Sequence, residues 1–300
     1  MRQLTVNRNE PLLTYLLEAL QLKRKAVKNL LAFGAVTVNG AATRQFDHPV
    51  VVGDTVTIGD LKTAVASERL SFARIQVVFE DAAIIVLDKP AGLLTVATDR
   101  NETDTLYFRL NQFLSDRAAA NKERALIVHR LDQETSGLVL FAKSMRVKQA
   151  LQAAWPAVEK KYWAVVEGQP PQDEGSISSY LTETRALEVF SNRNESEGAR
   201  RATTHYRRIE TRSGLSLLEV RLETGRKHQI RVHLSELGCP VVGDRRYGAK
   251  SDACHRLGLH AGSLELAHPD TGERLSFSSP LPKAFGKLFS RTATGRDFDG

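Results

Sequence analysis

The sequence predicts an α+β protein of two domains, and three observations support this class. Residues 1–62 contain two helical patterns followed by two short strand patterns, which together make a small α/β unit. Residues 63–73 are polar and weakly patterned, as in a linker. Residues 74–290 contain many alternating strand patterns and few helical ones, which favours a domain built on a sheet. Residues 291–300 are expected to form a loose tail.

The N-terminal domain begins with a helix predicted over residues 11–21, where four leucines share one face and Pro11 suits the first turn. A second helix follows and is expected to end at the cap residue Gly34. Strands are predicted at residues 36–38, before an Asn-Gly turn, and at residues 54–58. The second helix has a basic side formed by Lys23, Arg24, Lys25 and Lys28.

The larger domain opens with strands predicted at residues 75–79 and 83–87, and a turn at residues 88–92 leads into another strand. A further strand is predicted from residue 138 to residue 142. Helices are predicted over residues 106–120 and 145–158, and the remaining strands over residues 160–168, 176–190, 202–210 and 215–222.

The charge of the chain favours an acidic partner. Lys and Arg outnumber Asp and Glu by 42 to 35 among the 300 residues, for a net charge of +7. The segment from Arg200 to Arg256 holds thirteen Lys and Arg against six Asp and Glu, so the excess is concentrated there. Such a localised excess makes nucleic acid the first candidate partner.

The two cysteines, Cys239 and Cys254, have neither a metal-type spacing nor the pattern of a disulfide framework. The first residues lack the apolar core of a signal peptide. No apolar run approaches the roughly 20 residues that a membrane span needs. We therefore expect a cytoplasmic protein with no membrane partner.

The first motif that suggests chemistry is His-Arg-Leu-Asp-x-x-Thr-Ser-Gly-Leu at residues 129–138, a polar turn between two apolar runs. Asp132 is its central residue, and a turn that carries an acid, a base and hydroxyl groups can hold a functional site. An alternative is purely structural. Asp132 and Thr135 would then bond neighbouring backbone amides, and Gly137 would supply a positive φ angle.

The second motif, Thr-Gly-Arg-x-His-Gln-Ile-Arg-Val-His at residues 224–233, begins at a glycine turn and continues as a helical pattern. Its positive charge is dense, and the donors of its arginines suit a phosphate or a carboxylate. A metal site is disfavoured, because His228 and His233 are five residues apart rather than four and no carboxylate or cysteine completes a ligand set.

Taken together, the two motifs closely resemble those of the RluA-type pseudouridine synthases, in the branches that modify large-subunit ribosomal RNA and transfer RNA. The resemblance spans roughly residues 75–285, and it departs at Val96-Ala97, where many members carry His-Pro. Weaker matches are Asp88-Lys89-Pro90-Ala91-Gly92-Leu93, Lys161-Tyr162-Trp163-Ala164, Gly243-Asp244, Tyr247-Gly248, Leu259-His260-Ala261 and His268-Pro269.

The resemblance implies a pseudouridine synthase fold with a mixed, mainly antiparallel sheet, and an isomerisation of uridine that needs no cofactor or metal. It assigns catalysis to Asp132, a pairing role to Arg231, and stacking on the base to Tyr162. It places Arg130 in the gap left by the flipped uridine. The other expected substrate contacts are His129, Thr135, Arg226, His228, Gln229 and Leu259.

Residues 10–60 resemble the alpha-L RNA-binding domain found in a small-subunit ribosomal protein and in many RNA-modifying enzymes. In that domain the second helix and the loop after it face RNA, so Lys23, Arg24, Lys25 and Lys28 would contact phosphates and would not read sequence. The alternative is a generic helical cap whose basic residues are only solvated.

The leading hypothesis is therefore a monomeric RNA pseudouridine synthase that acts on structured RNA, with ribosomal RNA favoured and transfer RNA also a candidate. A second hypothesis is a non-catalytic RNA-binding or ribosome-assembly protein on the same scaffold. A third is a nucleoside glycosidase, which would need a pair of catalytic carboxylates, with Glu134 the only candidate near Asp132.

Overall fold

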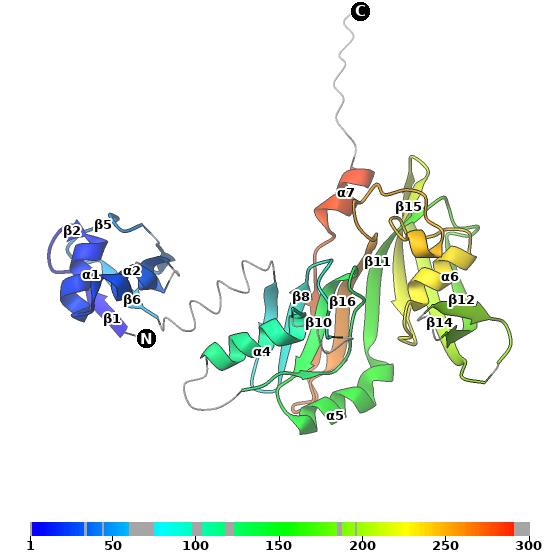
Figure 1. Ribbon diagram of the computed structural model, residues 1–300, viewed down its shortest axis with the longest axis horizontal. Helices are drawn as coiled ribbons and strands as arrows, with labels where there is room; N and C mark the ends of the chain where they lie inside the picture. The colour runs from blue at the N-terminus through cyan, green and yellow to red at the C-terminus, as the bar shows by residue number, and fades with distance from the viewer. Residues whose placement is uncertain are drawn as a thin grey trace, which may run out of the picture. The chain divides into compact units, whose positions relative to one another are not determined.

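The computed structural model describes residues 2–32, 35–43, 45–59, 75–97, 104–117, 123–184, 188–195 and 197–290. The chain divides into two compact units, Met1–Ile75 with Phe108–Ala125 and Gln76–Tyr107 with Leu126–Gly300 (Figure 1). The predicted cap at Gly34, the linker at residues 63–73 and the tail at residues 291–300 lie outside the described residues, and the predicted domain boundaries stay predictions.

The first unit contains the two predicted helices, α1 (Leu12–Leu20) and α2 (Arg24–Ala32), and a four-stranded sheet. The strands run in the order β1 (Arg2–Thr5), β6 (Thr55–Ile58), β3 (Val36–Val38) and β4 (Ala41–Ala42), and β2 (Glu10–Pro11) pairs separately with β5 (Pro49–Val50). Asn39 and Gly40 both have positive φ angles, as a two-residue hairpin turn requires, so the predicted Asn-Gly turn is present.

The core of this unit follows from the spacing of apolar residues along its helices. Leu12 and Leu16 lie one turn apart on α1 and are fully buried, as are Val27 and Leu31 on α2. Pro11 precedes α1 as its N-cap rather than forming its first turn. Sequence analysis does not identify β1, which pairs with β6 at the edge of the sheet.

The second unit is built on an eleven-stranded sheet with helices on it (Figure 1). Nine strands lie in the order β13-β12-β14-β15-β11-β16-β10-β8-β7, while β17 pairs with β16 and β9 with β10. The pair β10–β16 is parallel and all other pairs are antiparallel, so the expected mixed, mainly antiparallel sheet is confirmed. The strands are β7 (Gln76–Glu80), β8 (Ile84–Lys89), β9 (Leu126–Ile127), β10 (Ser136–Ala142), β11 (Glu159–Glu167), β12 (Glu174–Glu183), β13 (Val189–Asn192), β14 (Arg200–Arg212), β15 (Leu215–Leu222), β16 (Leu259–Ala267) and β17 (Arg274–Ser278).

Helices α5 (Met145–Ala154), α6 (Gln229–Glu236) and α7 (Lys283–Phe289) belong to the second unit, whereas α4 (Leu106–Arg117) begins in it and continues in the first. The helix predicted over residues 145–158 is shorter than expected. Ser144 caps its start by accepting a hydrogen bond from the Val147 amide (3.2 Å), and a 3₁₀ turn at Trp155–Ala157 ends it. Pro156 lies in that turn and has no amide hydrogen to continue the helix.

The strand predicted over residues 176–190 is in fact two strands of a hairpin. Strand β12 ends at Glu183, and the Thr184 amide donates to the Glu188 carbonyl (2.8 Å) before β13 begins. Sequence analysis does not identify β16, β17 or α7. The omission of β16 matters, because this strand lies between the two motifs in the sheet.

Strand β16 pairs with β10, which begins within the first motif, and with β11, which carries Tyr162. Strand β11 in turn pairs with β15, which leads into the second motif. Gly137 lies opposite Ala261 in the parallel pair and has a φ angle of +112°. A Cβ atom at Gly137 would lie 2.2 Å from the Ala261 carbonyl oxygen, so only glycine fits. The loop of the first motif therefore enters the sheet at a fixed point.

Candidate active site

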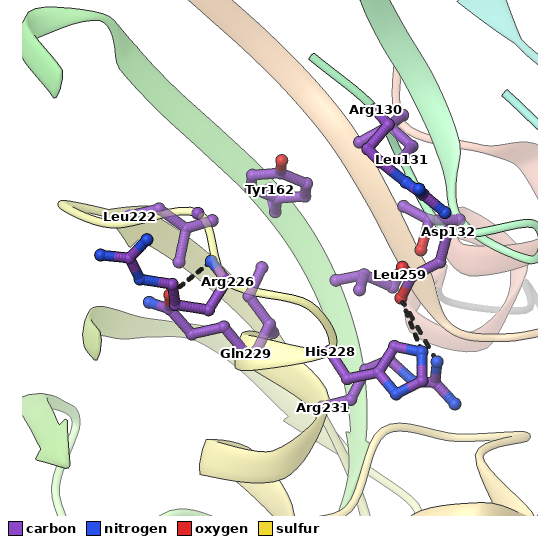
Figure 2. Close-up of a pocket in the computed structure, with 13 residues that line it drawn as sticks. Arg130, Leu131, Asp132, Tyr162, Leu222, Arg226, His228, Gln229, Arg231 and Leu259 are labelled. Carbon is purple, nitrogen blue, oxygen red and sulfur yellow. Dashed lines mark hydrogen bonds and ion pairs between the residues drawn. The ribbon is translucent and has the colours of Figure 1, made fainter. Parts of the chain in front are cut away.

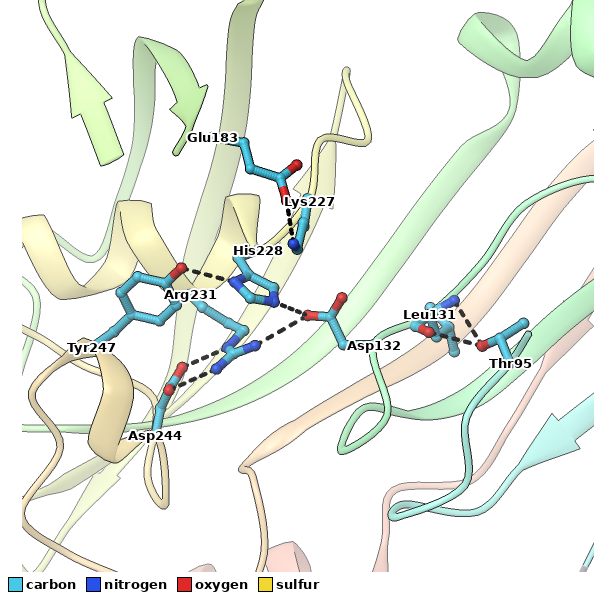
Figure 3. Close-up of polar contacts among 9 residues, drawn as sticks. All are labelled: Thr95, Leu131, Asp132, Glu183, Lys227, His228, Arg231, Asp244 and Tyr247. Atoms are coloured by element: carbon cyan, nitrogen blue, oxygen red, sulfur yellow. Dashed lines mark hydrogen bonds and ion pairs between the residues drawn. The ribbon is translucent and has the colours of Figure 1, made fainter. Parts of the chain in front are cut away.

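The loop of residues 128–135 carries Asp132 and is held from behind by the segment that follows β8. The Thr95 hydroxyl donates to the Leu131 carbonyl (2.7 Å) and accepts from the Leu131 amide (3.1 Å), and this hydroxyl is almost fully buried (Figure 3). The Thr95 side chain thus provides a hydrogen-bond partner for both the amide and the carbonyl of Leu131, the residue before Asp132.

Lys89 is a second support for the same loop. Its ammonium group is fully buried and donates to the carbonyls of Leu93 (2.7 Å), Gln133 (2.9 Å) and Pro90 (3.0 Å). Burial lowers the pKa of Lys89 to about 7. Lys89 therefore joins three backbone carbonyls at one point, and the Gln133 carbonyl also accepts from the Gly92 amide (3.0 Å).

The backbone of the loop follows the structural alternative in part. The Thr135 amide donates to the Asp132 carbonyl (3.1 Å), which closes a turn, and Gly137 supplies the positive φ angle. The Asp132 carboxylate, however, contacts a different part of the chain. Its Oδ2 atom accepts from Nη1 of Arg231, 99 residues away, at 3.3 Å.

Arg231 connects Asp132 to a second carboxylate. Its Nε and Nη2 atoms donate to the two oxygens of Asp244 at 2.6 and 2.8 Å, while Nη1 faces Asp132 (Figure 3). The Asp244 side chain is 1% exposed, that of Arg231 12% and that of Asp132 27%. The exposure of the three charged side chains therefore rises from Asp244, in the interior, through Arg231 to Asp132, which faces the open pocket. The two carboxylates raise the pKa of Arg231.

His228 lies on the same side of Asp132, with its Nε2 atom 3.7 Å from Oδ2 of Asp132. Its Nδ1 atom shares a hydrogen bond with the Tyr247 hydroxyl (2.8 Å). Burial lowers the pKa of His228 to about 4, against the opposing effect of the Asp132 charge, so the ring is neutral at pH 7. His228 also has a positive φ angle of 54° at the start of α6, a conformation that is uncommon outside glycine.

The opposite wall of the pocket is apolar and aromatic. Tyr162 projects from β11 between Leu222 and Asp132, and Leu259 from β16 lies below it (Figure 2). Burial and the nearby Asp132 charge raise the pKa of Tyr162. The pocket thus has a carboxylate on one side and a ring with a neutral hydroxyl on the other.

All predicted catalytic and substrate-binding residues except His129 line the pocket. Arg130 and Arg226 are exposed at its rim, while Thr135 is buried in its wall. Arg226 also donates from Nε to the Arg201 carbonyl (3.3 Å).

His129 is separated from the pocket. Its ring stacks on Trp155 with centroids 4.4 Å apart, and Nε2 accepts from the Leu140 amide (3.0 Å). Burial lowers the pKa of His129 to about 3, so the ring is neutral at physiological pH. In this position His129 supports the loop from the side of α5 and does not face a substrate in the pocket.

Gln229 lines the pocket but uses its whole amide within the protein. Its oxygen accepts from Thr224 Oγ1 (2.8 Å) and the Arg226 amide (3.0 Å), and its nitrogen donates to Thr203 O (3.0 Å) and Thr204 Oγ1 (2.9 Å). All four hydrogen-bonding positions of the amide are therefore occupied. The residue holds the turn before α6 in place and has no donor or acceptor left for a base.

The predicted RNA contacts lie in the first unit. Lys23, Arg24 and Lys28 are exposed, and the Lys28 ammonium lies 5.3 Å from the centre of the Phe46 ring. The side chain of Lys25 lies outside the described residues.

Sequence analysis does not identify four residues that support the site: Lys89, Thr95, Asp244 and Tyr247. Lys89, Asp244 and Tyr247 each lie within one of the weaker family matches, and that membership is a signal that could have identified them. No such signal marks Thr95, because its hydroxyl bonds the backbone of Leu131, which is 36 residues away in the sequence.

The described residues hold no group of three His, Cys, Asp or Glu side chains arranged to bind a metal ion. His233, one of the two histidines weighed for that role, is fully buried and bonds Thr204 Oγ1 (2.8 Å) and Ser179 Oγ (2.9 Å). In the same part of the chain, no helix combines the length and apolar character needed to span a membrane.

Comparisons with known proteins identify the family and support the fold. The model of the family described as RNA pseudouridylate synthase matches residues 83–236, which include Asp132, Tyr162 and Arg231. A structure of human RNA pseudouridylate synthase domain containing 4 superposes with a TM-score of 0.61 at 23% identity, over 76% of this chain and 96% of that one, and supports the fold.

Relatives match along most of their length. An uncharacterised RNA pseudouridine synthase of Bacillus subtilis, YlyB, is 33% identical over 88% of each chain. Ribosomal large subunit pseudouridine synthase D of Zymomonas mobilis is 32% identical over 90% of this chain and 89% of its own, and that of Pseudomonas aeruginosa 34% over 88% and 86%. The chain therefore belongs to the RNA pseudouridylate synthase family, and it is an isomerase that converts uridine in RNA into pseudouridine.

Proposed function

We propose that Asp132 is the catalytic group of this isomerase and that its substrate is ribosomal RNA of the large subunit. One observation carries the catalytic assignment. Among the described residues that line the pocket, Asp132 is the only carboxylate, and it lies between the Arg231 guanidinium and the Tyr162 ring.

The reaction breaks the bond between N1 of uracil and C1′ of ribose, rotates the base, and forms a bond from C5 to C1′. The base loses one proton from C5 and gains one on N1, so neither a redox partner nor a second substrate is consumed. A single ionised carboxylate serves this chemistry either by attacking as a nucleophile or by removing a proton from the sugar. Both roles require Asp132 to be charged and exposed to the pocket.

The wall opposite Asp132 suits a flipped base. Tyr162 offers a ring for stacking, and Leu222 and Leu259 offer apolar surface on either side. We expect Arg130, which is exposed and lines the pocket, to fill the gap that the extruded uridine leaves in the RNA. Arg226, also exposed at the rim, supplies a donor for a flanking phosphate.

The substrate assignment rests on the relatives whose names include the large ribosomal subunit and on the basic segment between Arg200 and Arg256. We place the enzyme in the cytoplasm as a monomer. Transfer RNA is the second candidate, because a pocket that takes one flipped base and its neighbours would not by itself distinguish the two kinds of RNA.

Mapping of pseudouridine in total RNA tests this proposal. Cells with and without the gene are compared by carbodiimide labelling and primer extension, and we expect at least one site in large-subunit ribosomal RNA to disappear on deletion. Complementation with the wild-type gene should restore that site, whereas the Asp132→Asn variant should not. A lost site confined to transfer RNA would overturn the substrate assignment and leave the chemistry intact.

The first unit is proposed to bind RNA through the basic side of α2. Because Lys23, Arg24 and Lys28 are exposed, their binding to phosphates would release counterions and make RNA affinity depend on salt. We expect the removal of residues 1–62 to weaken RNA binding and to reduce the slope of log Kd against log salt. The reduction should be about 0.7 to 0.9 for each phosphate that these residues neutralise.

A triple variant of the whole chain, Lys23→Gln, Arg24→Gln and Lys28→Gln, separates charge from the loss of the unit itself. It should reproduce most of the change in slope while leaving the melting temperature within a few degrees, because all three side chains are exposed. An unchanged salt slope in both variants would show that α2 does not contact RNA.

A further inference from the structure

The turn that follows α6 contacts both residues that face Asp132. Asp244 begins this turn, and its carboxylate binds the Arg231 guanidinium through two hydrogen bonds of 2.6 and 2.8 Å. Tyr247 ends the 3₁₀ turn Arg245–Tyr247, and its hydroxyl lies 2.8 Å from Nδ1 of His228. Figure 3 shows the two contacts side by side, on the far side of Arg231 and His228 from Asp132.

Asp244 fixes the direction in which Arg231 points. A guanidinium has a rigid fork of donors, and Asp244 occupies the Nε and Nη2 pair in the bidentate geometry that this fork prefers. Only Nη1 then remains directed at Asp132, at 3.3 Å. Since Asp244 is almost fully buried and Asp132 is not, the buried carboxylate holds the arginine and the exposed one is left for chemistry.

Tyr247 acts on both partners of Asp132. Its ring lies under the Arg231 guanidinium, with 5.0 Å between the guanidinium carbon and the ring centroid, and stacks edge-on to the His228 ring. When the Tyr247 hydroxyl donates to Nδ1, the neutral His228 ring carries its proton on Nε2. That nitrogen is the one that faces Asp132, at 3.7 Å.

We propose that Asp244 and Tyr247 are positioning residues that hold Arg231 and His228 in the orientation in which both donate toward Asp132. This inference rests on the proposed catalytic role of Asp132. It assigns neither residue any contact with the substrate. Their whole effect on the rate therefore passes through Arg231 and His228.

A double-mutant cycle tests the Asp244 part. We expect Asp244→Asn to lower kcat about 10- to 100-fold, the cost of a misplaced catalytic group, while Kd for the substrate RNA stays within about threefold. In an Arg231→Met background, the same Asp244→Asn change should have no further effect on kcat. Effects that multiply in the double variant would show that Asp244 acts independently of Arg231 and would overturn the inference.

Tyr247→Phe provides a milder second cycle, because the ring remains under Arg231 and only the hydroxyl is removed. We expect kcat to fall about 3- to 10-fold, as for the loss of one neutral hydrogen bond. The amide of a His228→Gln variant keeps a donor near the Nε2 position without help from Tyr247. Tyr247→Phe should therefore be silent in that background, and a full effect there would contradict the inference.

Two controls complete the design. Asp270→Asn breaks an ion pair with Arg146 (2.8 Å) outside the pocket and should leave kcat unchanged, which excludes a general effect of removing surface charge. Asp132→Asn is assayed on the same RNA. If the Asp132→Asn variant stays active, the proposed catalytic assignment fails. If it is inactive but the effects on kcat multiply in the double variants, only the positioning inference fails.

Discussion

Asp132→Asn is expected to lower pseudouridine formation by the purified enzyme about 10⁴-fold or more, the scale seen when an essential nucleophile or base is removed. The amide keeps the shape of the carboxylate but has no charge with which to attack the base or sugar or to accept a proton. Arg231 and His228 would then face a neutral group. Affinity for RNA should stay within a few-fold, because no phosphate contact is assigned to Asp132.

The matched control is Glu134→Gln, two residues along the same loop. Glu134 is exposed and does not line the pocket, so we expect activity within about twofold of wild type. The same pair of variants tests the glycosidase hypothesis, which requires a second catalytic carboxylate. An inactive Glu134→Gln variant, or free uracil released by the wild-type enzyme, would support a glycosidase and contradict the proposal.

The distance between Asp132 and Arg231 shows what the sequence can and cannot predict. Their contact joins residues 99 apart, and no local pattern predicts it; only the resemblance of both motifs to one family does. The structure explains it by the order of the strands. Only β16 and β11 separate β10 from β15 in the sheet, and the loop before β10 and the helix after β15 meet through the contact of Asp132 with Arg231.

Local patterns predict the elements that carry strong signals. The Asn-Gly turn has positive φ angles at both residues, and the alternation in residues 160–168 gives β11. The hairpin between β12 and β13 is predicted as one strand, because its turn lacks the glycine that marks most such turns. Strand β16 is not predicted although it alternates, and its position is set by pairing with strands far away in the sequence.

Membership in a motif does not show which side of the backbone a residue faces. His129 and Gln229 belong to the two strongest motifs, yet one packs on Trp155 and the other uses its amide to hold a turn. Asp244 lies outside both motifs, yet it binds Arg231, the residue whose guanidinium contacts Asp132. Burial and hydrogen-bond partners decide these roles, and both depend on tertiary structure.

The second large effect is expected in stability at mildly acidic pH. Burial lowers the pKa of His129 to about 3 and the pKa values of His228, His233 and His260 to about 4. In the unfolded chain each would titrate near 6.5, so below that pH the unfolded state binds protons that the folded state does not. Stability is therefore full above pH 6.5 and is lost as pH falls toward 4.

Each such histidine lowers the free energy of unfolding by about 1 kcal/mol per pH unit between pH 6 and pH 5, so the four together contribute about 4 kcal/mol. Urea unfolding at pH 7, 6 and 5 measures this slope. Both tryptophans, Trp155 and Trp163, lie in the second unit with the four histidines, so tryptophan fluorescence reports the unfolding of that unit alone.

His233→Asn identifies the source of the slope, because His233 is fully buried between two hydroxyl groups and no carboxylate of the described residues bonds its ring. This variant should be less stable at pH 7 but should have a slope smaller by about 1 kcal/mol per pH unit. The control is His255→Asn, an exposed histidine with a positive φ angle that asparagine also adopts, and it should keep the wild-type slope.

A wild-type free energy of unfolding that stays constant from pH 6.5 to 4.5 would mean that the four histidine rings are protonated in the folded protein. In that case His228 would be charged beside Asp132 in the same range, and its neutral tautomer could not be part of the site.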